Sequence, residues 1–232
     1  MRLLKDLYVL TGPGFGLLSY VYGIKYSGGL VLIDAGMIGQ SEKQIDKWRR
    51  YWGLEKEKVT HVLLTHSHWD HVGCAAAYRK EGTLIAAHEG DQKNIEAGGP
   101  LPEDPDQNAW PPCKIDLVLK GDGELPIGEL DLKVIHIPGH TPGSVIYRLN
   151  MEGKDIWFVG DFIKPDGFGA QHEMGWCGDE RFSPRDLLAS ARKLWKLRPD
   201  GVLGGHGIKM DNCEGLPREF YNNLLLALPC RG

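Results

Sequence analysis

The sequence predicts an α/β fold with two layers of β-sheet in the middle and helices outside them. Two observations carry this prediction. In each half of the 232-residue chain, short apolar segments punctuated by glycine are followed by segments with helical spacing, and sheets covered by helices would bury all of them. The chain also contains no internal repeat, low-complexity tract or linker, so we expect residues 1–232 to form a single domain.

In the first half, the expected strands are apolar runs bounded by turn residues. A helix is expected to begin at Ser41, which can cap it together with Gln44, because Ile45, Trp48 and Trp52 recur at helical spacing. The expected strands are residues 7–10, 18–26, 30–33, 59–64 and 83–87, and the further helices are residues 73–80 and 89–97.

In the second half, residues 115–158 are typical of strands joined by short turns. The strands expected there and beyond are residues 130–137, 144–149, 155–159 and 201–203, and the helices are residues 184–197 and 217–226. Residues 98–112 and 164–183 lack periodicity, and irregular segments of that length usually have a function in a compact fold. We expect them to wall a substrate pocket.

Composition excludes several classes of protein. Apolar residues make up 42% and charged residues 25%, which argues against disorder. The formal charge is -4 without a basic run, so we expect no nucleic-acid partner. Asp6 interrupts the first apolar run, and no stretch approaches the ~20 apolar residues of a membrane span. Five cysteines without a CxxC pair indicate reduced thiols, so we expect a cytoplasmic protein, with Cys177 in a glycine-rich segment.

Nine histidines are unusual for this length, and three lie in the run Thr-His-Ser-His-Trp-Asp-His at residues 65–71. The run follows an expected strand, where side chains two apart point the same way, so His66 and His68 can aim at one point. Asp70 and His71 follow as the chain turns into a helix. This mixture of ligands suits zinc and also iron or manganese. The alternative is a polar loop in which Asp70 only caps the helix.

Three further candidate ligands each follow an expected apolar strand. They are His140 in Pro-Gly-His-Thr-Pro-Gly, Asp161 in Val-Gly-Asp, and His206 in Leu-Gly-Gly-His-Gly. Taken singly, each histidine could be an ordinary loop residue and Asp161 a turn residue. Together they predict one metal site, because loops fixed on a rigid scaffold are where such sites lie.

This set, with Leu-Ile-Asp-Ala-Gly at residues 32–36, resembles the metallo-β-lactamase fold superfamily over roughly residues 7–207. The resemblance implies a four-layer αββα sandwich of two mixed sheets with two zinc ions, or alternatively iron or manganese, at one edge. It implies a first metal at His66, His68 and His140, a second at Asp70, His71 and His206, and a bridging Asp161. Asp34 would orient the ligand loops by holding the outward nitrogen of a histidine.

The implied activity is that of a dinuclear-metal hydrolase. A hydroxide bridging the metals, placed by Asp70 and Asp161, would cleave an ester, thioester or lactone bond of a small molecule. Glyoxalase II enzymes share His-x-His-Trp-Asp-His but carry an added helical region after the last ligand that supplies glutathione contacts, whereas only 26 residues follow His206 here, which argues against that substrate. The alternatives are a mononuclear iron persulfide dioxygenase, a β-lactam-hydrolysing enzyme and a metal-stabilised binding protein. Asp161 stands where β-lactamases of the cysteine-bearing type have Cys.

Aromatic side chains beside the motif and in the two irregular segments are the expected substrate contacts. These are Trp69, Trp110, Phe168, His172 and Trp176. The alternative for Trp110 and Trp176 is that they pack to hold their loops, and for His172 that it has no role. The other three histidines, His61, His88 and His136, are expected to be structural. The sequence does not predict the oligomeric state.

Overall fold

Two mixed β-sheets form the middle of the fold in the computed structural model, which describes residues 1–99, 110–165 and 174–228. The first sheet has seven strands in the order β1-β2-β3-β4-β5-β6-β7, antiparallel from β1 to β4 and parallel from β4 to β7. Its strands are β1 (Arg2–Leu4), β2 (Leu7–Val9), β3 (Tyr22–Tyr26), β4 (Gly29–Ile33), β5 (Val59–Leu63), β6 (Leu84–His88) and β7 (Leu117–Leu119).

The second sheet has six strands in the order β13-β12-β11-β10-β9-β8, and only the pair β11 and β12 is parallel. Its strands are β8 (Gly123–Ile127), β9 (Leu130–His136), β10 (Val145–Met151), β11 (Lys154–Gly160), β12 (Gly201–Gly204) and β13 (Ile208–Lys209).

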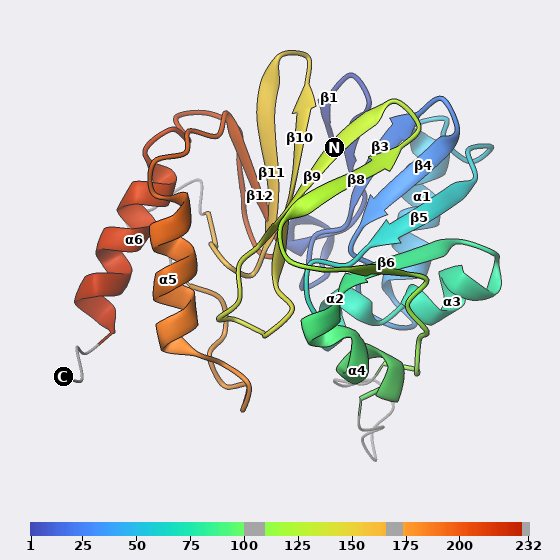
Figure 1. The fold of residues 1–232 in the computed structure, drawn as a ribbon. Coiled ribbons are helices and arrows are strands. Elements are labelled where there is room, and N and C mark those ends of the chain that lie inside the picture. The colour runs from blue at the N-terminus through green and yellow to red at the C-terminus, as the bar shows by residue number, and fades with distance from the viewer. Residues whose placement is uncertain (100–109, 166–173, 229–232) are drawn as a thin grey trace.

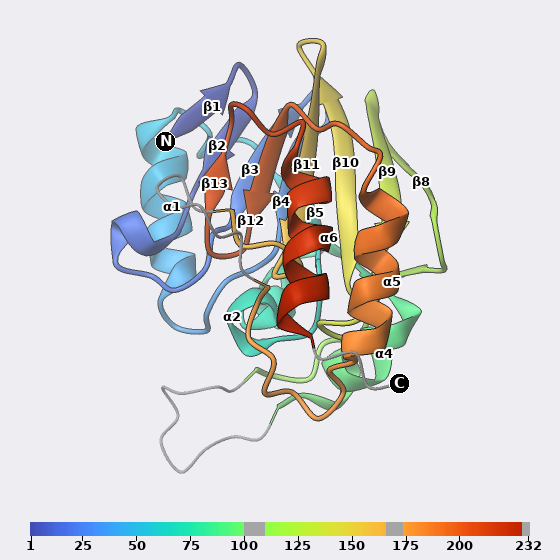
Figure 2. The ribbon, with the colours of Figure 1, turned by 90° about the vertical axis from the view of Figure 1, so that its left-hand side faces the viewer.

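Helices cover the outer face of each sheet, so the expected four-layer αββα sandwich is confirmed (Figure 1). Figure 2 shows α5 and α6 lying side by side over the second sheet. The helices are α1 (Ser41–Tyr51), α2 (Trp69–Val72), α3 (Ala75–Lys80), α4 (Glu89–Ala97), α5 (Pro184–Leu194) and α6 (Leu216–Ala227), with a 3-10 turn η1 at Pro13–Phe15.

The core has three apolar layers because the central strands bury both faces. In β4, Leu30 and Leu32 pack under the helices of the first sheet, whereas Val31 and Ile33 face the second sheet. In β11, Phe158 likewise lies between the sheets, and its neighbours pack under α5 and α6. Such two-sided burial holds the strand ends rigidly, and the candidate site lies at those ends.

Two local expectations are wrong. Ser41 is the first residue of α1 and does not cap it: its hydroxyl accepts a hydrogen bond from the Met37 backbone N–H at 2.8 Å. The left-handed Gly36 (φ 73°) turns the chain so that Met37 meets that hydroxyl. The strand expected from residue 18 begins only at Tyr22, because the Ser19 carbonyl accepts from the Thr11 hydroxyl and the Ser19 hydroxyl donates to the Asp70 carbonyl of α2, instead of bonding to a neighbouring strand.

The other element boundaries lie close to the expected ones. The helix expected at residues 73–80 is α3, which begins at Ala75, and a separate short helix, α2, precedes it within the histidine motif. The helix expected at 184–197 ends at Leu194. None of the helices within the described ranges has both the length and the apolar character needed to cross a bilayer.

Candidate metal centre

The candidate ligands gather where strands of both sheets end. β5 leads into His66 and His68, and β9 leads into the turn that carries His140. β11 ends at the residue before Asp161, and β12 ends two residues before His206. The sequence pattern of an apolar strand followed by a candidate ligand therefore has a simple explanation. Each of these strands ends at the same edge of the sandwich, where its polar residue lies.

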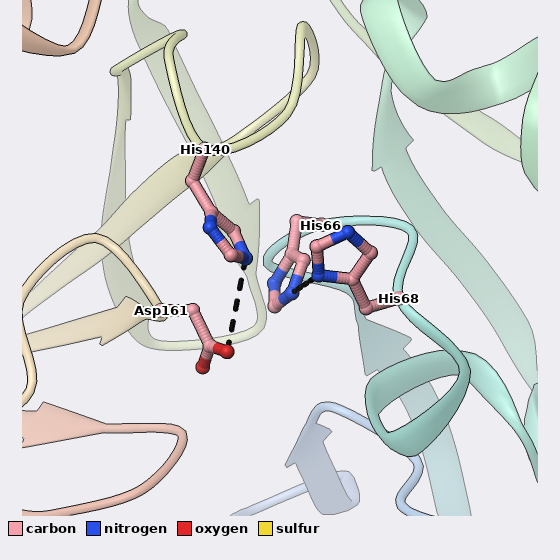
Figure 3. Close-up of side chains that lie close together, drawn as sticks. All are labelled: His66, His68, His140 and Asp161. Atoms are coloured by element: carbon pink, nitrogen blue, oxygen red, sulfur yellow. Dashed lines mark hydrogen bonds and ion pairs between the residues drawn. The ribbon is translucent and has the colours of Figure 1, made fainter. Parts of the chain in front are cut away.

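The first cluster consists of His66, His68, His140 and Asp161, whose ligand atoms all lie within 4.8 Å of one another. Figure 3 shows the side chains converging from three segments, with the two histidines of the motif facing His140 and Asp161. His66 Nε2 lies 3.1 Å from His68 Nδ1, and His140 Nε2 lies 3.7 Å from Asp161 Oδ2. These atoms could hold one metal ion.

The second cluster consists of Asp70, His71 and His206, also within 4.8 Å. His206 Nε2 lies 3.3 Å from Asp70 Oδ2. Asp161 reaches this cluster too, with Oδ2 at 3.0 Å from His206 Nε2 and Oδ1 at 3.3 Å from His71 Nε2. The Asp161 carboxylate therefore stands between the two clusters.

Asp34 contacts two of the histidines, His71 directly and His66 through Thr65. His71 Nδ1 donates to Asp34 Oδ2 at 2.8 Å, which leaves Nε2 free to bind a cation. The Thr65 hydroxyl donates to the same carboxylate at 2.9 Å and accepts from His66 Nδ1 at 3.0 Å. The left-handed backbone of Asp34 (φ 62°), which aspartate tolerates better than most residues, turns the side chain toward both.

Two other partners were not foreseen. His68 Nε2 donates to Asp179 Oδ2 at 2.8 Å, and His206 Nδ1 donates to the Leu18 carbonyl at 3.0 Å. Asp179 could not be predicted as a partner because it lies in an irregular segment without a periodic signal. The Leu18 carbonyl could not be predicted because every residue has a backbone carbonyl. In both cases the other ring nitrogen faces the clusters.

Several buried atoms of the clusters make no hydrogen bond within the described part of the chain. They are Asp70 Oδ2, His71 Nε2, both ring nitrogens of His140, and Asp161 Oδ1. An unpaired buried polar group costs about 1–3 kcal/mol, so a converging set of them needs a common partner. Imidazole nitrogens and carboxylate oxygens are ligands for a divalent transition metal, and the residues present fit such an ion.

The electrostatics of the first cluster favour neutral imidazoles at His66 and His140. Burial lowers the pKa of His140 to about 4 despite the nearby Asp161. Burial, and then the neighbouring histidines His71 and His140, hold the pKa of His66 well below its ordinary value. A neutral imidazole can bind a cation without first losing a proton.

The second cluster has the opposite tendency. Burial opposes protonation of His206, but the adjacent carboxylates of Asp161 and Asp70 raise its pKa to about 9. The carboxylates likewise outweigh burial at His71, so the pKa of His71 lies well above its ordinary value. The pKa of Asp161 lies well below its own ordinary value. Without a metal, protons neutralise the carboxylates here, and a bound cation would displace them.

A pocket of about 890 Å³ opens beside the clusters. Its lining includes two expected substrate contacts, Trp69 and Trp176. It consists of Leu18, His68, Trp69, Asp70, Asp161, Lys164, Met174, Gly175, Trp176, Cys177, His206, Asn223, Leu224, Leu226 and Ala227. Trp110 is not in this lining, because it packs against the apolar core on the helix side of the first sheet. Phe168 and His172 lie outside the described residues.

Comparisons with known proteins agree with this geometry. The sequence model of the metallo-β-lactamase superfamily matches residues 14–206. A Bacillus subtilis protein named probable metallo-hydrolase YqgX is 31% identical over 157 residues, which is 65% of this chain and 69% of that protein. A hydroxyacylglutathione hydrolase of Cereibacter sphaeroides is 30% identical over 159 residues, 68% of this chain and 52% of that protein. The chain thus spans about half of that relative.

Solved structures share the fold. A subclass B3 metallo-β-lactamase of Bradyrhizobium japonicum superposes with a TM-score of 0.72 at 24% identity, covering 97% of this chain and 89% of that one. A metallo-β-lactamase of Cronobacter sakazakii superposes with a TM-score of 0.77 at 19% identity, covering 98% and 91%. At these identities the likeness establishes the architecture alone.

Proposed function

The chain belongs to the metallo-β-lactamase superfamily and is a hydrolase of that superfamily, and from this premise we propose that it uses two metal ions to cleave an ester, thioester or lactone bond of a small molecule. The observation that carries the proposal is the pair of adjoining clusters with Asp161 between them. The buried, unpaired atoms of these side chains support it, because two cations would satisfy them together.

In this proposal His66, His68 and His140 hold the first ion, and Asp161 contributes to both. Asp70, His71 and His206 hold the second. We favour zinc because histidine and aspartate are its usual ligands in hydrolases, with iron or manganese as alternatives. When bound, such ions supply a hydroxide nucleophile at neutral pH and polarise the bond to be cleaved.

The chain's own residues bind and orient the substrate. Met174 and Trp176 give one wall of the pocket an apolar surface suited to an acyl group, and Leu224 continues it on α6. Lys164 is the one lysine or arginine in the described lining and can pair with a negative group of the substrate. Kinship with a hydroxyacylglutathione hydrolase supports a thioester in particular.

The proposal extends to domain organisation and cellular location. We propose a single domain over residues 1–232 that acts on small molecules in the cytoplasm. Four cysteines in the described ranges, Cys74, Cys113, Cys177 and Cys213, are free thiols, which fits a reducing compartment.

The test is hydrolysis by protein stripped with a chelator and reloaded with Zn²⁺, Fe²⁺ or Mn²⁺. A panel of thioesters, lactones, simple esters and a β-lactam, together with oxygen uptake on a glutathione persulfide, separates the alternatives. We expect hydrolysis of an acyl substrate that is lost on stripping and restored by metal. Hydrolysis that persists in metal-free protein, or oxygen uptake with persulfide as the only turnover, would contradict the proposal.

A further inference from the structure

Asp179 is a carboxylate outside the two clusters that contacts a side chain of the first one. Its Oδ2 accepts a hydrogen bond from His68 Nε2 at 2.8 Å, and both side chains are about one-tenth exposed. A carboxylate can only accept, so this contact keeps the proton of the ring on Nε2. The lone pair of His68 then lies on Nδ1, the atom that faces His66 Nε2 at 3.1 Å.

Arg181 clamps this carboxylate in one orientation. Its Nη2 donates to Asp179 Oδ2 at 2.5 Å, and its Nε donates to Oδ1 at 3.0 Å. The Arg181 backbone N–H also donates to Oδ1 at 2.7 Å. Such a two-pronged pair fixes a carboxylate more firmly than a single contact, because the planar fork of arginine matches both oxygens.

The clamp is itself anchored to the loops that carry the candidate ligands. Arg181 Nη1 donates to the hydroxyl of Ser67, between the two histidines of the motif, at 3.0 Å, and lies 3.4 Å from Asp91 Oδ1. Asp91 is 1% exposed, and its other oxygen accepts from the hydroxyl of Thr141, next to His140, at 2.6 Å. Arg181 therefore ties Asp179 to both histidine loops.

The segment 174–183 that carries Asp179 is also attached by its backbone at both ends. Gly175 N–H donates to the Asp161 carbonyl at 2.9 Å, and Ser183 N–H donates to the Gly139 carbonyl at 2.8 Å. Between these points Trp176 lines the pocket and lies edge-on to the ring of His68 at 5.6 Å. One stretch of chain thus forms a pocket wall and contacts three of the ligand-bearing segments.

We propose that Asp179, held by Arg181, is the positioning residue that sets the tautomer and orientation of His68 for metal binding. The inference rests on the proposed metal centre. An asparagine at this position can turn its amide N–H toward the ring, which permits the proton on Nδ1 and removes the lone pair that faces the cluster. Partners of this kind typically change metal affinity by about 10- to 100-fold when they are replaced.

The chain offers a matched control in the pair of Arg79 and Asp116. Arg79 Nη2 lies 2.8 Å from Asp116 Oδ1 and its Nε contacts the same carboxylate, so the ion pair has the same two-pronged form. Asp116 also accepts a backbone N–H, from Ile85. It belongs to neither metal-binding cluster. Replacing Asp116 removes equal charge and a similar arginine contact without touching a candidate ligand.

The experiment is a Zn²⁺ titration in competition with a chelator, together with the absorption spectrum of the Co²⁺-loaded protein, for wild type, Asp179→Asn, Asp179→Glu and Asp116→Asn. We expect Asp179→Asn to bind the Zn²⁺ of the first cluster, which His68 holds, about 10- to 100-fold less tightly and to alter the Co²⁺ spectrum. Asp179→Glu, which is still only an acceptor, should retain more affinity than Asp179→Asn. Asp116→Asn should match wild type.

Unchanged Zn²⁺ affinity in Asp179→Asn, or an equal loss in Asp116→Asn, would overturn the inference. If Asp179→Asn does not fold, Arg181→Lys gives the same test, because lysine keeps the charge and cannot form the two-pronged clamp. That variant should also bind Zn²⁺ more weakly, and wild-type affinity would count against the role of Asp179. A wild-type protein that binds no metal would instead refute the proposed metal centre.

Discussion

Replacing Asp34 with alanine should destabilise the protein even when no metal is bound. The Asp34 carboxylate is 2% exposed and accepts from the Thr65 backbone N–H at 2.7 Å and from His71 Nδ1 at 2.8 Å. The Thr65 hydroxyl, which also donates to it, can rotate to another acceptor. Alanine would leave the first two donors buried without a partner.

The magnitude follows from these two donors. Each unpaired buried group costs about 1–3 kcal/mol, so Asp34→Ala should lower the free energy of unfolding by roughly 2–6 kcal/mol. Asp34→Asn keeps one acceptor oxygen and should lose about half as much. The matched control is Asp122→Ala, because Asp122 also accepts from a side chain, Lys193, and a backbone N–H, that of His136, but is half-exposed.

The assay is urea unfolding of chelator-stripped wild type and variants near pH 7, followed by circular dichroism. Asp122→Ala should stay within about 0.5 kcal/mol of wild type, as exposed substitutions usually do. A loss below about 1 kcal/mol in Asp34→Ala would refute the reasoning, because the stranded donors would then have found other partners. A loss of similar size in Asp122→Ala would do so as well.

Three further predictions concern the site and its surroundings. Asp161→Ala should weaken both proposed metals and lower hydrolysis by about 100-fold or more with little change in fold, and near-normal turnover would count against a shared ligand. Gly205→Ala should prevent metal binding, measured by Zn²⁺ titration, because the added methyl group would meet Asp161 Oδ1 and the ring of His71. Gly123→Ala is the control, because Gly123 faces open space and its backbone is not left-handed. For His88, burial and then the adjacent His136 lower the pKa to about 4. Its ordinary value is 6.5, so the unfolded chain binds the proton first and stability is lost as pH falls from about 6.5 through about 4. His88→Gln should lose less unfolding free energy over that window, and parallel pH profiles would show that His88 contributes nothing.

That the seven candidate ligands lie close together was predictable from the sequence, because the strands that precede them end at one edge of the sandwich. A polar residue that directly follows a buried strand has little freedom, so His140, Asp161 and His206 arrive at the edge where the motif at residues 65–71 begins. The expected role of Asp34 came instead from the resemblance to the superfamily, although Asp34 also directly follows a strand, β4.

What the sequence missed depends on irregular backbone. The contact between Asp179 and His68 joins residues 111 positions apart through a segment without periodicity. Ser41 was wrongly expected to cap its helix. The turn at Gly36 brings the Met37 backbone N–H to the Ser41 hydroxyl, and no pattern in the sequence marks that turn. Trp110 was assigned to the pocket by its place in an irregular segment, but large apolar side chains pack into whichever core lies nearest.

The central claim is that the two clusters together bind two metal ions. The most direct measurement is the metal content per chain, by mass spectrometry of the elements, of protein loaded with Zn²⁺ and freed of excess ion by gel filtration. The account predicts about two equivalents for wild type and fewer for Asp161→Ala. About one equivalent or less of any transition metal in wild type would contradict it.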